Sequence, residues 1–400
     1  MRIRPVLAAV LASYGGAASA DADWTFDPRV LAQFETDDNN RLTSVRGEEI
    51  SVQGAAIDVS LGMRARTPRS DFLVTPRVKT SFYPDDRDEE RQMGEIKGDW
   101  LYEGERWNAR VDGSFSVRTI LGRSFLDDDG GGLGEPDPGT GSGRTGEETE
   151  QYSTLFRPRF DFALTERTAL LLEGRYKNVE FDDQVQNDRQ NFEDTGVATG
   201  LEFQTSPTSS ISVLAGASMY EPEDGLDSDS QFLTAQWSNA LSETSQYYFR
   251  GGADRVKIDE PGADWETGFS GGAGIKWKFE VTELFLDYNH YLDPSASGRM
   301  VNRDQLRFDV LRLLSERSNL RLTSRVVFDE KAAEADDFEK REYLNARIQY
   351  EWRFRQDISL FGGYEYTWRE YEDDPTDATS NRFFLGIRYQ PKRLGTSASL

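Results

Sequence analysis

Apolar and polar residues alternate one by one along a stretch near the end of the chain. Leu344, Ala346, Ile348, Tyr350, Trp352 and Phe354 are apolar, and every residue between them is polar or charged. A period of two residues predicts a β-strand with one apolar and one polar face. The pattern recurs about every twenty residues, and no stretch after residue 20 is apolar enough to cross a bilayer as a helix. We therefore expect a chain built from amphipathic strands.

The alternation predicts eighteen strands. Their expected ranges are 24–35, 55–66, 71–83, 93–103, 106–119, 152–164, 168–180, 195–205, 209–220, 231–241, 246–257, 267–281, 283–291, 304–315, 319–329, 343–355, 358–371 and 381–390. The fold class that we expect is all-β, a transmembrane antiparallel up-and-down barrel. A soluble antiparallel sandwich would also alternate, because each of its strands buries one face. So many paired strands with regularly varied connections favour the barrel.

The connections between these strands alternate in length. Tight turns are expected at 68–70, 104–105, 165–167, 207–208, 243–244, 282, 316–318 and 356–357. Long connections are expected at 36–50, 84–92, 123–151, 181–194, 222–230, 259–266, 293–303, 330–342 and 372–380. Outer-membrane barrels have short periplasmic turns and long outer loops. We therefore place the long connections outside the cell.

The first twenty residues have the pattern of an export signal. Arg2 and Arg4 precede an apolar run from Val6 to Ala12, and Ala18-Ser19-Ala20 forms a small-residue cleavage site. We therefore divide the chain into a signal peptide over 1–20, a barrel over 21–390 and a periplasmic tail over 391–400. The chain contains no Cys, so neither disulfides nor thiolate metal sites stabilise it.

Composition agrees with a barrel, whose lumen and loops are polar. Only 37% of the residues are hydrophobic and 30% are charged. Without the two arginines of the signal, the net charge of −24 becomes −26. Such a charge disfavours nucleic acid as a partner. Disorder is the other interpretation of low hydropathy with high charge, but 48 aromatic residues placed in alternation argue against it, since the chain has 8 Trp, 16 Tyr and 24 Phe.

The charges are unevenly placed along the expected barrel axis. The outer loops are acidic, as at 85–90 and 127–129, whereas the periplasmic end is basic, as at Arg69, Arg106 and Arg317. One interpretation is a field that draws a polyanion into the periplasmic mouth. The other is that acidic loops bind lipopolysaccharide through divalent cations while basic turns face the cell wall. Outer-membrane lipid and lipopolysaccharide are the expected partners.

Basic side chains alternate with the apolar positions in mid-strand and are expected to line the lumen. The candidate pore-lining residues are Arg77, Lys79, Arg110, Arg157, Arg159, Arg175, Lys276, Lys278, Arg321, Arg325 and Arg347. Rings of charge set the ion selectivity of pores. Acidic residues such as Asp112, Glu173 and Glu365 are interleaved with them, so cross-strand pairing that only tiles a wet lumen is an alternative.

Three strands carry a proline directly before an arginine. The pairs are Pro28-Arg29, Pro76-Arg77 and Pro158-Arg159. From the alternation of faces along each strand, we expect each proline side chain to face lipid and each arginine side chain to face the lumen. Because proline cannot donate a ladder hydrogen bond, we expect each one at a bulge or strand end.

Several segments together resemble the β-barrel porins of proteobacteria, some families of which are associated with exopolysaccharide secretion. The resemblance rests on the signal peptide, the segment Phe34 to Asn40, the run Thr75-Pro76-Arg77-Val78, and a barrel that fills the mature chain. It implies assembly by the barrel assembly machinery, which reads an aromatic strand end. Here Gly386 to Tyr389 has part of that signal, but residues 391–400 follow it.

Other chemistry finds little support in the sequence. The single His, His290, falls on the lipid-side face near the outer rim beside Tyr288, so we expect no catalysis. No metal-ligand spacing and no phosphate-binding glycine motif is present, and we expect no cofactor and no metal. Segment 123–151, with eight Gly, eight acidic residues and two Arg, folds into the lumen or lies outside as a loop.

The sequence therefore predicts an outer-membrane channel for the passive passage of small, anionic solutes. One alternative is an export component for an anionic exopolysaccharide that works with periplasmic export proteins. A second alternative is a structural barrel that is plugged by 123–151.

Overall fold

The computed structural model describes residues 22–120, 149–182, 189–295, 297–332, 340–372, 376–392 and 394–396. The expected signal peptide at 1–20 lies outside these ranges. So does the expected segment 123–151, apart from its last three residues, which belong to a strand.

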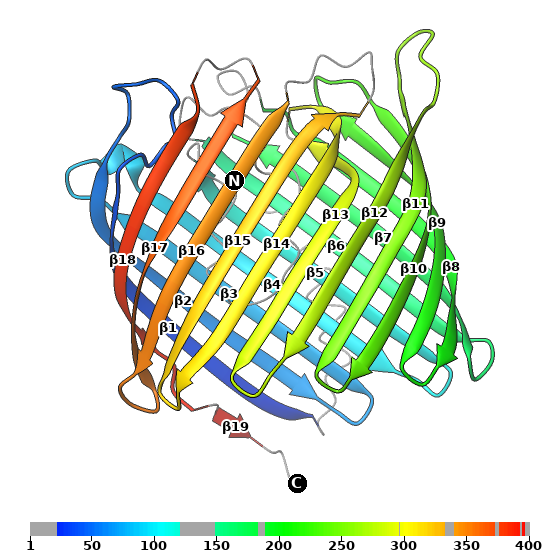
Figure 1. Cartoon of the computed structure of the whole chain (residues 1–400), viewed down its shortest axis with the longest axis horizontal. Helices are drawn as coiled ribbons and strands as arrows, with labels where there is room; N and C mark the ends of the chain where they lie inside the picture. Colours follow the sequence, from blue (N-terminus) through cyan, green and yellow to red (C-terminus); the bar gives the residue numbers. More distant parts are fainter. Residues whose placement is uncertain are drawn as a thin grey trace.

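The described residues form one closed antiparallel barrel of eighteen long strands (Figure 1), which confirms the predicted fold class. Each strand pairs with its neighbours in sequence, and β1 pairs with β18 to close the cylinder. The strands are β1 (Asp23–Asp37), β2 (Val52–Arg66), β3 (Ser70–Phe82), β4 (Arg91–Glu103), β5 (Trp107–Ile120), β6 (Thr149–Ala163), β7 (Thr168–Phe181), β8 (Phe192–Ser206), β9 (Ser209–Pro222), β10 (Ser228–Ser242), β11 (Ser245–Ile258), β12 (Glu266–Lys278), β13 (Thr282–Ser295), β14 (Arg299–Ser315), β15 (Ser318–Lys331), β16 (Arg341–Arg353), β17 (Ile358–Tyr371) and β18 (Ala378–Tyr389).

The two ends of the barrel differ in their connections, as predicted. Tight turns join the strands at the lower end in Figure 1, and the longer connections lie at the upper end. A short 3₁₀ helix, η1 (Arg87–Glu89), lies in the connection between β3 and β4. The predicted one-residue turn at Thr282 is wrong, because Thr282 begins β13 and the turn is 279–281. A hairpin needs at least two loop residues to reverse the chain.

Most strands extend further toward the outer end than the sequence pattern indicated. β8 begins at Phe192 rather than residue 195, and β14 begins at Arg299 rather than residue 304. The strands continue past the end of their alternating segments, and we expect this part to lie above the bilayer, where the outward face does not have to be apolar. The alternation that marks a membrane-spanning strand is therefore lost before the strand itself ends.

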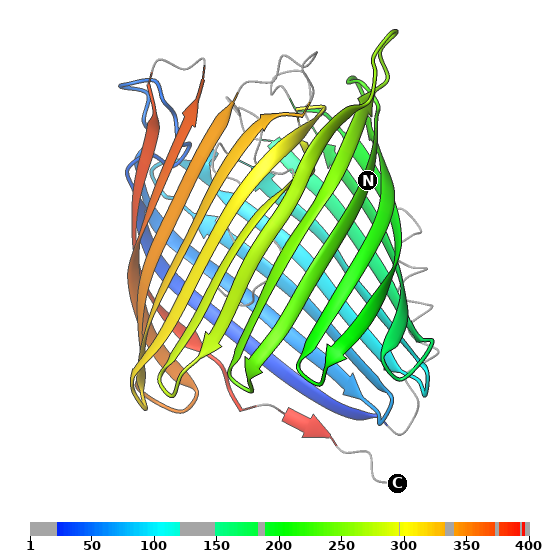
Figure 2. The same ribbon diagram turned by 45° about the vertical axis from the view of Figure 1, so that its right-hand side comes forward.

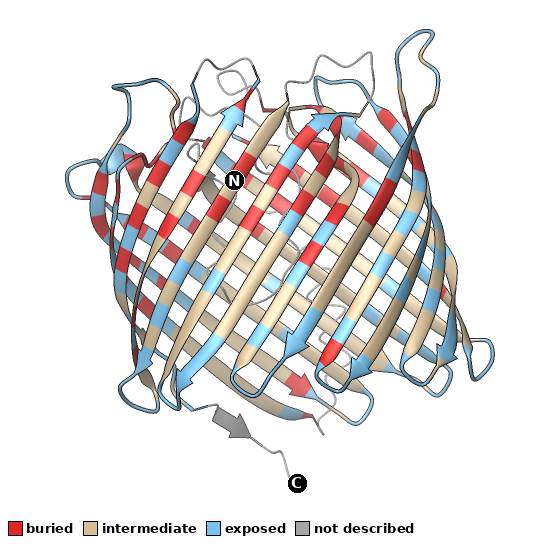
Figure 3. Ribbon diagram, in the orientation of Figure 1, coloured by how far each residue is buried: buried red, intermediate tan, exposed pale blue. Residues whose placement is uncertain are grey.

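The outward face of the barrel is apolar. Val78 is 61% exposed and Leu385 is 67% exposed, and Ile348 lies on the same surface. The residues between them face inward, and buried positions alternate with exposed ones along the strands (Figure 3). Backbone groups are satisfied inside a closed ladder, which lets the apolar surface contact lipid.

The three Pro-Arg strands confirm the expectation of local breaks. Pro76 lies where the pairing between β2 and β3 is interrupted, from Ser60–Arg77 to Met63–Val74. Pro158 lies in the corresponding gap between β6 and β7. Pro28 lies where β1 has left β18. Each proline stays in register with the strand on its other side. The missing N–H therefore coincides with an interruption of the ladder on one side only.

A short strand covers the seam where the barrel closes. β18 pairs with β1 only from Val30 to Asp37, whereas β2 pairs with the whole of β1. The strand β19 (Leu394–Thr396) pairs with Trp24 to Phe26 of β1, below the barrel end of β18 (Figure 2). The tail expected over 391–400 therefore contributes a strand of its own.

Aromatic side chains cluster at the end of the barrel that carries the tight turns. Tyr102 stacks on Trp107 with ring centroids 4.7 Å apart, and Trp107 lies 5.6 Å from Phe160. Trp277 stacks on Phe279 in the same way at 4.6 Å. Such belts lie at the level of lipid headgroups. Among the residues described, no helix has the length and hydropathy needed to span a membrane.

A closed, even-stranded barrel with an apolar exterior, an aromatic belt and short turns at one end is the form in which proteins cross the bacterial outer membrane. The bacterial outer membrane is where this barrel resides.

Candidate pore constriction

The lumen face carries the basic residues that the sequence singled out. They lie on β3, β5, β6, β7, β12, β15 and β16, and each has the opposite parity to the lipid-facing apolar positions of its strand. On β15, for example, Leu322 and Phe328 are exposed outward, whereas Arg321 and Arg325 take the opposite parity. Whether these side chains line an open path stays a prediction.

At least eight of the eleven basic residues form ion pairs with lumen-facing carboxylates. The nitrogen–oxygen distances are 2.6 Å for Arg77–Asp58, 3.0 Å for Arg110–Asp99, 2.8 Å for Arg157–Asp112, 3.1 Å for Arg159–Glu173, 2.9 Å for Arg175–Asp194, 2.9 Å for Lys278–Glu283, 2.8 Å for Arg321–Asp309 and 3.9 Å for Arg347–Glu365. Pairing of this kind covers the inner wall and holds each cationic group in place, and solvated pairs contribute little stability individually.

The other three basic residues have different surroundings. Lys79 is buried and interacts electrostatically with Glu35, which also pairs with Arg382. Arg325 is buried beside Arg303 and the rings of Tyr291 and Tyr343. Lys276 is exposed on the inner wall.

The outer end of the β13–β14 hairpin bends away from the barrel wall. β12 and β13 pair only from Gly271–His290 to Lys278–Glu283. Residues 266–270 of β12 still pair with β11 but have no partner in β13. β13 and β14 nevertheless stay paired with one another up to Ser295–Arg299. The hairpin therefore leaves its neighbour β12 as a unit.

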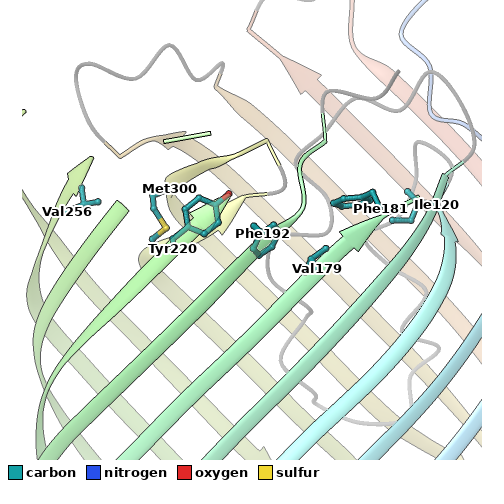
Figure 4. Packing of buried hydrophobic residues seen from close by; sticks show 7 residues of the cluster. All are labelled: Ile120, Val179, Phe181, Phe192, Tyr220, Val256 and Met300. Atoms are coloured by element: carbon teal, nitrogen blue, oxygen red, sulfur yellow. The ribbon is translucent and has the colours of Figure 1, made fainter. Parts of the chain in front are cut away.

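The bent hairpin packs against the outer ends of strands that are not its neighbours in the barrel wall. Met300 belongs to an apolar cluster with Ile120, Val179, Phe181, Phe192, Tyr220 and Val256 (Figure 4). The Tyr220 hydroxyl donates a 2.6 Å hydrogen bond to the carbonyl oxygen of Ser295. Because β10, β11 and β12 separate β9 from β13 in the barrel, these contacts place the hairpin inside the lumen. The hairpin forms the constriction described below.

The constriction is charged on both sides. On the hairpin side, the fully buried Arg303 pairs with Asp293 and with Asp329, the latter at 2.7 Å. On the facing wall, Asp194 pairs with Arg175. The Asp293 carboxylate interacts electrostatically with Arg175 and Lys177 of β7, although five strands separate β7 from β13. With Arg325, the described constriction holds four basic and three acidic side chains.

Two further connections reach over the lumen. Leu42, in the connection between β1 and β2, is buried with Val327, Tyr343 and Ala378. The Arg369 guanidinium donates a 2.6 Å hydrogen bond to the Leu42 carbonyl oxygen. This connection therefore covers the inner wall formed by β15, β16 and β18.

Arg189 lies in the connection before β8 and reaches the opposite wall. Its guanidinium lies over the ring of Phe181, 5.5 Å from the ring centroid, and it interacts with Tyr371, Arg341 and Arg369. Burial, with the nearby guanidinium groups of Arg341 and Arg369, lowers the pKa of Arg189 to about 10. Arg189 remains charged at neutral pH, so it adds positive potential to the outer mouth.

Sequence reasoning missed Lys177, Asp194, Asp293 and Arg303. Three of these lie in or next to ranges that were predicted as outer connections, 181–194 and 293–303. The inward positions near them are apolar, as at Val179, Phe181 and Phe192, because the hairpin covers them. In a membrane-spanning strand the apolar residues usually face outward, so apolar residues at inward positions reverse the usual pattern. One signal was available in the sequence: Lys177 lies two residues after Arg175 and therefore faces the same side of β7.

His290 lies on the lipid-side face, as its parity indicated. Its Nδ1 is 3.0 Å from a carboxylate oxygen of Asp304, which also accepts a hydrogen bond from Tyr288. The ring stacks on Phe269. In the part of the chain that the structure describes, no group of three or more His, Cys, Asp or Glu residues could hold a metal ion.

Comparison with known proteins yields structural neighbours only. No protein-family model matches the chain, and no curated protein matches it. OpdO of Pseudomonas aeruginosa is 12% identical, with 94% of this chain and 98% of that chain covered and a TM-score of 0.44. OccAB4 of Acinetobacter baumannii is 11% identical over the same shares, with a TM-score of 0.45. OccK5 (OpdH) of Pseudomonas aeruginosa is 9% identical, with 92% and 98% covered and a TM-score of 0.45. The strand pairing of the chain itself establishes its fold.

Proposed function

We propose that this barrel is a passive, porin-like channel of the outer membrane for small solutes and that it favours anions. The observation that carries the proposal is the constriction, where the β13–β14 hairpin lies inside the lumen and brings four basic and three acidic side chains together. An eighteen-stranded barrel is wide enough to leave an aqueous lumen around such a hairpin.

The position of the charges decides their effect on permeating ions. At physiological salt the screening length is about 8 Å. The acidic outer connections, such as 221–229, therefore act weakly on an ion that has already entered the lumen. Arg175, Lys177 and Arg303 lie at the narrow part itself, where low-dielectric walls focus their field.

A conductance measurement tests whether the barrel is open. The full-length mature barrel, purified in detergent and inserted into a planar bilayer, is expected to give discrete single-channel steps. The Arg175→Ser and Lys177→Ser double variant is expected to alter the step size, while Lys278→Ser, at the periplasmic end, is the matched control. If wild type inserts but passes no current, the proposal is wrong and the plugged barrel is favoured.

Export of an anionic exopolysaccharide with periplasmic proteins stays a prediction from the sequence. So do the partners expected there, lipopolysaccharide and the barrel assembly machinery. The absence of enzyme activity is likewise a prediction, which rests on the lipid-side position of His290.

A further inference from the structure

One sector of the barrel carries no basic residue at all. From Gln190 to Phe249 the sequence contains no Lys, Arg or His, and this stretch forms β8, β9, β10 and the first part of β11. Elsewhere the inner wall is tiled by ion pairs. The sector therefore differs chemically from the rest of the lumen.

The inner wall of this sector is lined by amides and hydroxyls placed side by side. The strand register puts Gln204 beside Ser210, Ser210 beside Ser238, and Ser238 beside Tyr248. The next row toward the outside places Glu202 beside Ser212 and Ser212 beside Gln236, so one carboxylate stands at the edge of the neutral side chains. Neutral donors and acceptors in adjacent rows can bind successive hydroxyl groups of one solute.

An aromatic ring borders these rows. Tyr248 pairs in register with Gly274, and a Cβ atom at Gly274 would lie 2.3 Å from the tyrosine Cε1. The glycine thus lets the ring lie flat across β12, and the Tyr248 hydroxyl is anchored by a hydrogen bond to Asp287. A flat ring held in this way presents one face for packing against C–H groups of a solute.

Lys276 lies near the ring, on the adjacent strand β12. Lys276 lies in register between Gln246 of β11 and Phe285 of β13. Among the residues that the structure describes, Lys276 makes no ion pair, whereas Lys278 on the same face pairs with Glu283 at 2.9 Å. The ammonium group of Lys276 is therefore available to a carboxylate from solution.

These side chains line one cavity of about 680 Å³ at the periplasmic end of the lumen, which includes Gln204, Ser210, Gln236, Tyr248 and Lys276. Its charged lining residues are two cations, Lys276 and Arg167, and the carboxylates Glu166 and Glu202. We propose that this cavity binds a polyhydroxylated carboxylate of the sugar-acid class. Lys276 holds the carboxylate, the amides and hydroxyls bind the solute hydroxyls, and Tyr248 packs against its carbon skeleton. This inference rests on the proposed function, since it names the solute that the channel takes.

The test compares three probes on the mature barrel. Gluconate carries both chemical features, hexanoate has the carboxylate without hydroxyls, and glucose has the hydroxyls without the charge. Binding to the detergent-solubilised barrel is measured by calorimetry, and block of chloride current is measured in planar bilayers. Gluconate is expected to bind at least about tenfold more tightly than either other probe, the ratio produced by about 1.4 kcal/mol of added hydrogen bonding.

Variants assign the binding to the cavity. Lys276→Gln and Tyr248→Leu are expected to weaken gluconate binding about tenfold, and Lys278→Gln is the matched control that leaves it unchanged. Equal binding of gluconate and hexanoate, or equal effects of Lys276→Gln and Lys278→Gln, would overturn the inference while the channel still conducts. A barrel that binds gluconate but carries no current would support the cavity and contradict the proposed channel.

Discussion

At the scale of single residues, neighbours in one strand meet different surroundings. Ile348 of β16 is 42% exposed on the lipid-facing surface. Gln349 takes the opposite parity, and its side-chain oxygen accepts a 3.0 Å hydrogen bond from Arg347. The same substitution at these two positions therefore has different consequences.

Replacing Ile348 with Arg puts a charge against the hydrocarbon and is expected to cost about 2–4 kcal/mol of folding free energy, as for charges near the bilayer midplane. Gln349→Arg is expected to be nearly neutral because this side chain lies in the wet lumen. Equilibrium unfolding in urea from phospholipid vesicles measures both. Equal losses would show that β16 does not separate a lipid face from a lumen face.

The buried ion cluster on the hairpin gives a second prediction. Arg303→Met leaves the Asp293 and Asp329 carboxylates buried without their cation, which is expected to cost about 3–5 kcal/mol. Arg321→Met removes a more exposed pair with Asp309 and is expected to cost less than about 1 kcal/mol. Urea unfolding of both variants makes the comparison. A small loss for Arg303→Met would mean that water reaches the cluster.

At the scale of elements, the bent β13–β14 hairpin is the feature that most shapes the lumen. A Cβ atom at Gly225 would lie 2.7 Å from the Gly298 carbonyl oxygen, so the hairpin tip touches the connection between β9 and β10. If the hairpin continued in the barrel wall and stayed paired with β12, its tip would instead lie beside the connection between β11 and β12.

Cross-linking distinguishes these two arrangements. The chain has no native Cys, so only the introduced cysteines can react with the thiol reagent. Asp224→Cys with Ser297→Cys is expected to join through a short bifunctional thiol reagent and to shift on a gel. Gly262→Cys with Ser297→Cys is the control pair and is expected to stay unlinked. The reverse result would mean that the hairpin stands in the wall.

The sequence predicted the membrane-spanning half of each strand well, because lipid on one side and water on the other impose the period of two. Ile348 and Phe383 illustrate this. It did not predict the outer ends. At the outer ends the hairpin packs with Val179 and Phe192, so these inward-facing positions are apolar instead of polar. Long-range contacts such as Tyr220 to Ser295 leave no local pattern that a sequence could display.

The eleven candidate basic residues were predicted by parity alone, and most of them prove to be paired. Parity gives the face of a side chain but not the distance to its neighbour across the ladder. Arg303 lay within a range predicted as a connection, so its place in the constriction depended on where the hairpin folds. The sequence therefore predicted the composition of the wall better than its narrowest point.

At the scale of the whole molecule, overall charge and local charge make opposite predictions. The net charge of −24, or −26 without the expected signal, would by itself attract cations. The described constriction holds more basic than acidic side chains, and Arg189, Arg341 and Arg369 lie close together at the outer end of the barrel. Because screening limits the reach of the outer acidic connections, the charges at the constriction should determine which ions the pore prefers.

The reversal potential of the purified barrel across a potassium chloride gradient in a planar bilayer tests this account most directly. The account predicts a reversal potential displaced toward the chloride equilibrium potential. Changing Arg325 and Arg347 to Ser should reduce the displacement, and the control variant Gln349→Arg should not. A potential displaced toward potassium, or one that ignores the loss of both arginines, would contradict the claim that the inward basic residues select the permeating ion.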